Sequence, residues 1–329
     1  MLNRYFREFS VTAVLGLLLA FLALFAPHFY EAQPLLSRLT AAAPKLVVAC
    51  GLTLVLLTRQ IDISVGSIFA VCSVIGGLLT TEKWPLPLAM GATVLVGASL
   101  GILNGTLVAG LQLPSIVVTL ATMVTLREGL RLAQQGVFIN LPEDVQWFGL
   151  SMISGQLTIC AAALSLLLAL SLALRWVAVG RWLYAIGSDA EAARLAGLRP
   201  RLTTFWVFVL LGALTGLAAI LNLVQSPQVD PATGRLLELE VIAASVVGGV
   251  AISGGRGNLG GVLAGLLLLL CISPALTYLG VKPYWDKAIQ GTVLLLTVVA
   301  DGIRSRRPLS RHSTLTIQQR KQRTTDELR

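Results

Sequence analysis

Apolar and polar positions along this chain fall into long blocks and do not alternate residue by residue. Ten apolar segments are separated by short polar connections. Their lengths match the roughly 20 residues that cross a lipid bilayer as a helix. The pattern predicts an all-α, polytopic membrane protein of about ten transmembrane helices, at residues 10–27, 42–58, 66–80, 87–111, 115–133, 156–178, 202–223, 237–252, 259–279 and 285–301.

Composition supports a chain embedded in lipid. Apolar residues make up 55% of the 329 residues, charged residues only 12%, and the mean hydropathy is +0.80. Soluble domains carry roughly 25% charged residues, so this chain cannot coat a soluble globule of its size. A soluble single-domain enzyme is excluded, and no polar stretch is long enough for a separate soluble domain.

Basic residues predict the orientation in the membrane. They gather before residue 10, at 175–201 and at 304–329. Six predicted helices separate the first group from the second, and four separate the second from the third, so all three lie on one side. Basic residues favour the cytoplasmic side, which predicts that both termini are inside. The opposite side would hold Arg38, Lys45, Lys83, Arg235, Lys282 and Lys287.

The two ends of the chain each have an alternative interpretation. Basic residues before an apolar run also occur in signal peptides, but residues 25–29 (FAPHF) make a poor small-residue cleavage site, which favours a retained first helix. The basic tail fits attraction to anionic lipid. Nucleic-acid binding is disfavoured because residues 304–329 include no aromatic side chain.

Cysteine and histidine usage argues against a metal centre or a disulfide framework. The four cysteines are scattered through apolar segments, as small core residues are. The two histidines, His28 and His312, are far apart and form no zinc-protease motif.

The connection between the sixth and seventh segments predicts a short helix outside the bilayer. Gly187 ends one element, Ser188 or Asp189 can cap the next, and Glu191 falls near its first turn. Alanines follow, and Gly197 suits the position after a helix end. Small side chains allow a close approach, so this helix is either a plain connection or a docking site for a cytoplasmic partner.

Residues 59–67 (RQIDISVGS) place a carboxylate between two apolar segments. An aspartate at the centre of a membrane helix costs about 2.5–3.5 kcal/mol, so embedded carboxylates are usually functional. Asp62 either caps the third segment, assisted by Ser64, or lines a passage through the membrane. The two roles are compatible.

Glycine pairs interrupt the stretch 238–261, at 248–249, 254–255 and 260–261. Such pairs break helices or permit close backbone contact. A phosphate-binding loop is excluded because no strand precedes them and no Gly-Lys-Ser/Thr sequence follows. The chain contains no Walker A motif, so ATP that drives it by that mechanism must be bound by another chain.

The fourth and fifth segments carry further polar residues. Asn104 either joins helices or faces a polar path. Glu128 and Arg131 have the spacing of a helical ion pair, with contact to an external partner as the alternative. Residues 101–108 also resemble residues 257–264 in sequence. The two stretches lie on predicted helices that run in opposite directions, as they would in an inverted repeat. Regular glycine spacing is also a general helix-packing pattern, which is the alternative explanation.

Taken in order, these stretches resemble the membrane permease subunits of bacterial sugar ABC importers, in the branch for ribose, xylose and arabinose. The resemblance covers roughly residues 40–305 and rests on four motifs, at 59–67, 113–122, 180–197 and 237–257.

The resemblance implies a function and a set of partners. Two permeases, identical or different, form the pathway in the bacterial cytoplasmic (inner) membrane. A cytoplasmic ATPase subunit binds the ATP, a periplasmic binding protein delivers the sugar, and the permease itself carries no cofactor. Residues 1–303 would form the transmembrane permease domain with a coupling loop at 179–201, and residues 304–329 a basic cytoplasmic tail.

Three sets of residues are expected to serve this function. The set expected to contact the ATPase is Ser188, Asp189, Ala190, Glu191, Ala192, Ala193 and Gly197. The set expected along the translocation pathway is Asp62, Ser64, Ser67, Asn104, Thr119, Thr122 and Ser245. The expected helix breaks are Gly248, Gly249, Gly254 and Gly255.

Two departures from the family pattern leave the substrate open. Arg59 and Gln60 stand where the family has a glycine pair, which is similar to permeases for autoinducer 2, and Glu128 follows Arg127 where an Arg-Gly step is usual. Rhamnose permeases are also similar. The alternative function is an ion-coupled sugar transporter, disfavoured because Asp62 stands almost alone as an embedded charge. A membrane enzyme is disfavoured because no Ser/His or His/Asp pair lies in facing segments.

Overall fold

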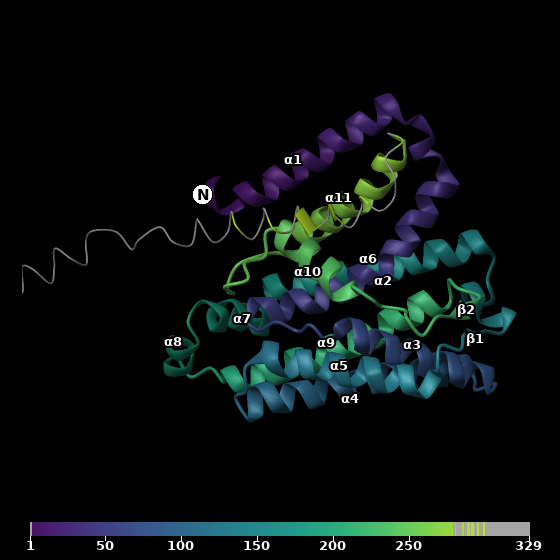
Figure 1. Ribbon diagram of the computed structural model, residues 1–329. Helices are drawn as coiled ribbons and strands as arrows, with labels where there is room; N and C mark the ends of the chain where they lie inside the picture. The colour runs from purple at the N-terminus through teal and green to yellow at the C-terminus, as the bar shows by residue number, and fades with distance from the viewer. Residues whose placement is uncertain are drawn as a thin grey trace, which may run out of the picture.

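The apolar segments form helices because a backbone in lipid must satisfy its own hydrogen bonds. The computed structural model describes residues 2–278 and, beyond them, Gly280, Trp285, Ala288, Ile289, Gly291, Thr292, Leu295 and Val299. Most of the described chain is helical (Figure 1). Its main helices are α1 (Leu2–Phe25), α2 (Ala32–Leu57), α3 (Val65–Thr81), α4 (Leu86–Gly105), α5 (Ser115–Gln134), α6 (Met152–Trp176), α7 (Ala178–Ser188), α8 (Ala190–Leu195), α9 (Pro200–Leu223), α10 (Leu237–Val247) and α11 (Leu259–Tyr278).

Shorter elements complete the described fold. A π-helical turn, Thr106–Gly110, extends α4, and 3₁₀ turns lie at Pro27–Tyr30 and Glu143–Gly149. Strands β1 (Ile139–Asn140) and β2 (Gln228–Val229) pair antiparallel, with Ile139 opposite Val229.

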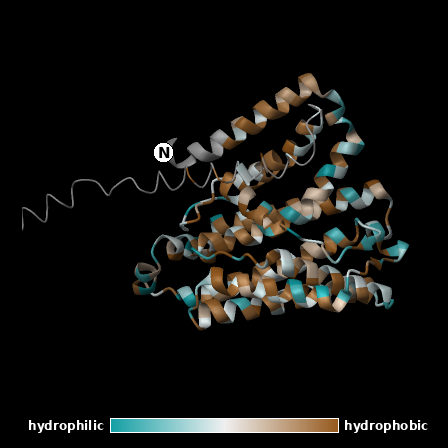
Figure 2. Cartoon of the chain, viewed as in Figure 1, coloured by the Kyte–Doolittle hydropathy of each residue, from teal (hydrophilic) through white to brown (hydrophobic). Residues whose placement is uncertain are grey.

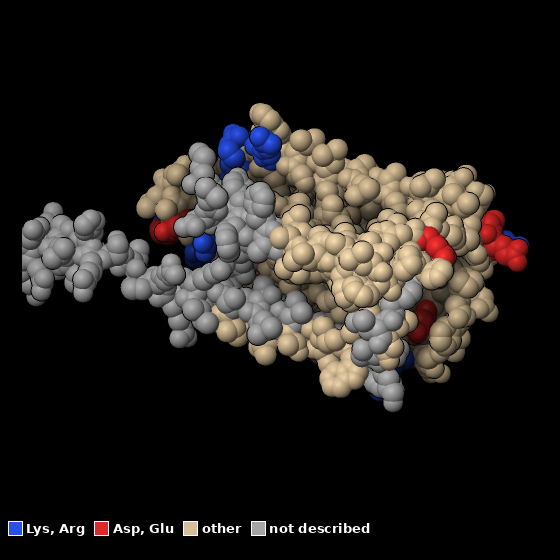
Figure 3. Space-filling model, turned by 90° about the horizontal axis from the view of Figure 1, so that it is seen from above, with Lys and Arg blue, Asp and Glu red and all other residues tan. Residues whose placement is uncertain are grey.

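Five helical stretches of the described chain are long and apolar enough to cross a membrane. They are Ala32–Leu57, Leu86–Gly110, Met152–Trp176, Pro200–Leu223 and Leu259–Thr277. Figure 2 shows hydrophobic residues along most of their lengths. In Figure 3 the charged side chains on the face shown lie mainly toward its two ends. The chain is therefore mostly helical and suited to a bilayer, whereas the exact number of spans stays a prediction.

Nine of the ten predicted segments coincide with described helices, and three boundaries were wrong. Helix α1 begins at Leu2, not at residue 10. Helix α2 begins at Ala32, not at residue 42, so Lys45 lies halfway along a helix and not on the outer side. Helix α10 ends at Val247, not at 252. The tenth segment, 285–301, lies largely outside the described residues, and the tail at 304–329 lies wholly outside them.

Close helix contacts depend on glycine. Helices α4 and α9 cross where Gly97 and Gly101 face Gly212 and the carbonyl of Phe208, and a Cβ at any of these glycines would collide with the opposite backbone. Such contact brings helix backbones together where apolar burial gives no driving force in lipid. Helix α2 lies in the centre, and leucines such as Leu95 of α4 and Leu168 of α6 are exposed by 67% and 58%, as expected for faces toward lipid.

Connections alternate between the two ends of the bundle. At one end, the α4–α5 connection meets the start of α9, where Arg201 Nη2 donates to Gln112 Oε1 at 2.7 Å, close to α8. At the other end lies the β1–β2 pair, which joins the segments after α5 and α9 (Figure 1). The N-terminus of α1 lies at the α8 end. The echoing stretches 101–108 and 257–264 lie on helices that run in opposite directions, and the inverted repeat stays a prediction.

Candidate functional site

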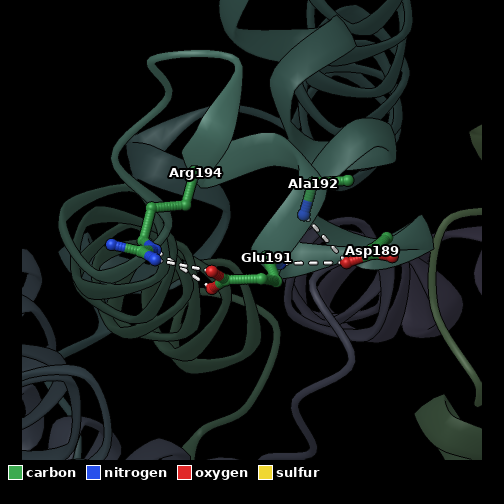
Figure 4. Close-up of polar contacts among 4 residues, drawn as sticks. All are labelled: Asp189, Glu191, Ala192 and Arg194. Atoms are coloured by element: carbon green, nitrogen blue, oxygen red, sulfur yellow. Dashed lines mark hydrogen bonds and ion pairs between the residues drawn. The ribbon is translucent and has the colours of Figure 1, made fainter.

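The predicted short helix outside the bundle is present as α8 (Figure 4). Asp189 is its N-cap, because the carboxylate accepts hydrogen bonds from the backbone N–H groups of Glu191 and Ala192, both at 3.0 Å. The helix ends in a Schellman motif: the N–H of Leu198 donates to Ala193 O, and Gly197 has φ +85°. Both ends of this short helix are thus fixed by its own sequence.

The surface of α8 is charged and accessible. Arg194 donates two hydrogen bonds to the Glu191 carboxylate, at 2.5 and 3.0 Å. These bonds hold the pKa of the Glu191 carboxyl below its usual value, so the pair stays ionised at neutral pH and is lost only as the pH falls through that lowered value. Ala193 is buried, whereas Leu195 is 78% exposed.

A hollow of about 890 Å³ lies between α8 and the start of α9. Its lining includes the Glu191–Arg194 pair and, opposite them, Arg199, Arg201 and Gln112. The hollow is therefore lined by three arginines and one glutamate together with apolar residues such as Leu198 and Leu202.

Helix α7 was not predicted, because residues 179–201 were interpreted as a loop that contains one short helix. Its buried residues, Gly180, Leu183, Ile186 and Gly187, are spaced to lie on one face. Tyr184 anchors it by donating to the carbonyl of Gly257 at 2.8 Å. The spacing of this apolar face was a signal that could have predicted the helix.

A polar network lies at the start of α3. Asp62 Oδ1 accepts hydrogen bonds from the backbone N–H and the hydroxyl of Ser64, at 2.8 and 2.6 Å. Asn104 of α4 donates to Ser64 Oγ at 2.8 Å and to Asp62 Oδ2 at 3.4 Å. Thr122 of α5 donates to Asn104 Oδ1 at 2.8 Å. The residue that directly precedes α3 is Ser64, so Asp62 caps the turn before the helix and is not itself the N-cap.

The extended segment before α3 runs along α5. Thr119 Oγ1 accepts a hydrogen bond from the N–H of Ile63 at 3.2 Å, and Ser67 donates to Met123 O at 2.9 Å. Ser115, which is not among the predicted pathway residues, accepts a hydrogen bond from the N–H of Ile61 at 3.2 Å. Ser245 lies instead on α10, where it donates to Val241 O. Six of the seven predicted pathway residues therefore lie along the α3–α4–α5 contact.

All seven of these side chains are buried, none more than 7% exposed. Apart from Ser245, these residues form hydrogen bonds that join the segment 58–64 and α3 to α4 and α5, which offsets the cost of burying polar groups among apolar helices. Their place along the pathway stays a prediction.

The predicted helix breaks follow α10. Gly249, Gly254 and Gly255 have φ of +95°, +79° and +70°, and Gly248 caps the helix end. The pair 260–261 does not break α11; a Cβ at Gly261 would collide with the carbonyl of Gly248, so this pair serves close packing instead.

Asp62 was expected to stand almost alone as an embedded charge, but other charged residues are partly or wholly buried in the described structure. Lys45 of α2 forms an ion pair with Glu240 of α10 at 2.6 Å. Arg127 of α5 donates to the carbonyls of Thr233 and Gly234 at 3.5 and 3.3 Å. Glu238 is 7% exposed. The scarcity of embedded charge is therefore not an argument against ion coupling.

Comparisons with known proteins place the chain in a family. Residues 35–298 match the family described as "Branched-chain amino acid transport system / permease component". The chain is 35% identical over 296 residues, 89% of its length and 86% of the relative's, to the autoinducer 2 import system permease protein LsrC of Escherichia coli O157:H7. The LsrC proteins of Shigella flexneri and Salmonella typhi are 35% and 34% identical, over similar shares.

No solved structure matches the chain. The matched residues include most of α2 and all of α3 to α11, and so both α8 and the polar network at the start of α3. The relatives are transport permeases, not enzymes. The chain therefore belongs to the permease family of bacterial ABC importers and is a membrane permease component of an import system.

Proposed function

We propose that this permease imports a small sugar or sugar-like molecule, with autoinducer 2 the first candidate and rhamnose and ribose the next. The support is the similarity to LsrC proteins along 89% of the chain. It acts in the bacterial inner membrane with a second permease, identical or not, and receives its substrate from a periplasmic binding protein. A separate ATPase subunit binds the ATP, and this chain needs no cofactor.

The single observation that carries the coupling role is the geometry of α8. This helix projects from one end of the bundle, is capped at both ends, exposes Leu195, and lines a hollow that also contains Arg199 and Arg201. Docking of the ATPase there moves the connections at this end of the bundle. We propose that the helices around Asp62 and Ser245 then re-pack, so that the pathway opens to one side or the other.

Reconstitution tests this function. The permease is assembled in proteoliposomes with its ATPase and binding protein, and uptake of labelled autoinducer 2, rhamnose and ribose is measured. We expect uptake of one of them only with ATP on the ATPase side and binding protein on the other. Uptake by the permease alone, driven by a proton or sodium gradient, would show an ion-coupled transporter instead.

A further inference from the structure

Three connections meet at the base of α8. They are the end of α2 at Leu57, the end of α7 at Gly187, and the glycine-rich segment 253–255. Gly255 N–H donates to the carbonyl of Leu57 at 3.0 Å. A Cβ at Gly187 would collide with that same carbonyl and with the backbone of Gly255. The three backbones are therefore in direct contact, without side chains between them.

The side chain of Arg59 connects the segments that meet at the base of α8. Its Nε donates to Ser253 O and its Nη2 to Ser188 O, both at 2.7 Å. One planar guanidinium thus holds two segments that are far from it in the sequence. Arg59 does so from a left-handed backbone, φ +63°, a conformation that costs about 1 kcal/mol outside glycine.

The positions of these bonds connect two sites. Ser188 directly precedes Asp189, the cap of α8. Arg59 lies three residues before Asp62, which the network with Ser64 and Asn104 holds against α4. One side chain and a few backbone bonds therefore connect the base of α8 to segment 58–64.

We propose that Arg59 is the positioning residue that transmits movement of α8 to segment 58–64. The inference rests on the proposed function, because α8 must be moved by an ATPase for the link to act. Through its hydrogen bonds to Ser188 and Ser253, Arg59 connects the start of α8 to segment 58–64. The start of α3 therefore moves together with α8 during the transport cycle.

The experiment compares Arg59→Gln, Arg59→Gly and Arg59→Lys in the full reconstituted complex. Arg256→Gln is the matched control, because Arg256 is an exposed arginine next to segment 253–255. ATP hydrolysis and substrate uptake are measured on the same vesicles, and the amount of ATPase subunit that copurifies is recorded. Arg59→Gly is informative because glycine adopts φ +63° without strain, so loss of the side chain is separated from loss of stability.

We expect Arg59→Gln and Arg59→Gly to retain the ATPase subunit and its hydrolysis within about twofold. Uptake per ATP hydrolysed should fall about tenfold, because two charge-assisted hydrogen bonds are lost. Arg59→Lys should recover part of the loss, and Arg256→Gln should match the unmodified complex.

Two results would overturn the inference. One is unchanged uptake per ATP in Arg59→Gln and Arg59→Gly. The other is a parallel loss of hydrolysis, ATPase binding and uptake, which would mean that Arg59 only maintains the fold. Failure of the proposed function is distinct from both, because the unmodified complex would then show no ATP-dependent uptake, and the inference would fall with it.

Discussion

At the scale of single residues, Asn104 is the node of the buried polar network. Its amide uses both ends: the nitrogen donates to Ser64 and Asp62, and the oxygen accepts from Thr122. The sequence predicted that this amide either joins helices or faces a polar path. The hydrogen bond from Thr122 of α5 shows that the amide joins helices, and its place along a polar path stays a prediction. Partners so far apart in the chain could not be identified from one sequence.

Replacing Asn104 tests that role. Asn104→Leu should lower stability by about 1–2 kcal/mol, because it leaves Thr122 and the Asp62–Ser64 pair short of partners in a dry interior. Thermal unfolding of the purified protein in detergent measures the change. Ser99→Ala is the control, because Ser99 is exposed and bonds only its own helix. Equal melting temperatures for the two variants would mean that the network does not stabilise the fold.

At the scale of helices, the glycine contact between α4 and α9 makes a sharp prediction. Gly101→Ala should destabilise the protein by about 1–3 kcal/mol, because its Cβ would overlap the Phe208 carbonyl and push the helices apart. Gly91→Ala in the same helix meets nothing within 4 Å and should be neutral or stabilising by up to about 1 kcal/mol. Unfolding midpoints of the two variants are compared. A similar shift in Gly101→Ala and Gly91→Ala would mean that the close contact between α4 and α9 does not account for the loss of stability.

The accessible face of α8 can be altered without disturbing the bundle. Ala192 is exposed, so Ala192→Trp should fold and insert normally but block the close approach of a partner. Uptake should fall about tenfold or more, which corresponds to about 1.4 kcal/mol of lost binding. Reconstituted uptake measures it, with Ala161→Trp on the exposed face of α6 as control. Wild-type uptake in Ala192→Trp would reject the docking role.

The sequence predicted which helices are present better than it predicted where each helix begins and ends. Helices and caps with local signals were confirmed, as for Asp189 and Gly197 around α8. The start of α2 was missed because Arg38, Pro44 and Lys45 are poor helix or membrane signals, and only the packed structure pairs Lys45 with Glu240. Tertiary contact decides where such residues lie.

At the scale of the whole molecule, the two ends of the bundle differ in character. One end carries α7, α8 and the segments that Arg59 connects, and the other carries the β1–β2 pair (Figure 1). The polar network at the start of α3 is tied by backbone and side-chain bonds to the first end. The sequence predicted the separate motifs, but their meeting at Leu57, Gly187 and Gly255 depends on long-range contacts that spacing does not encode.

The most direct test of this account is the side of the membrane on which α8 lies. Leu195→Cys is made in a protein whose native cysteines are replaced by alanine, and a membrane-impermeant maleimide is applied to spheroplasts and to inside-out vesicles. We predict labelling of the vesicles only, and protection when the ATPase subunit is bound. Labelling of Leu195→Cys in intact spheroplasts would contradict the account.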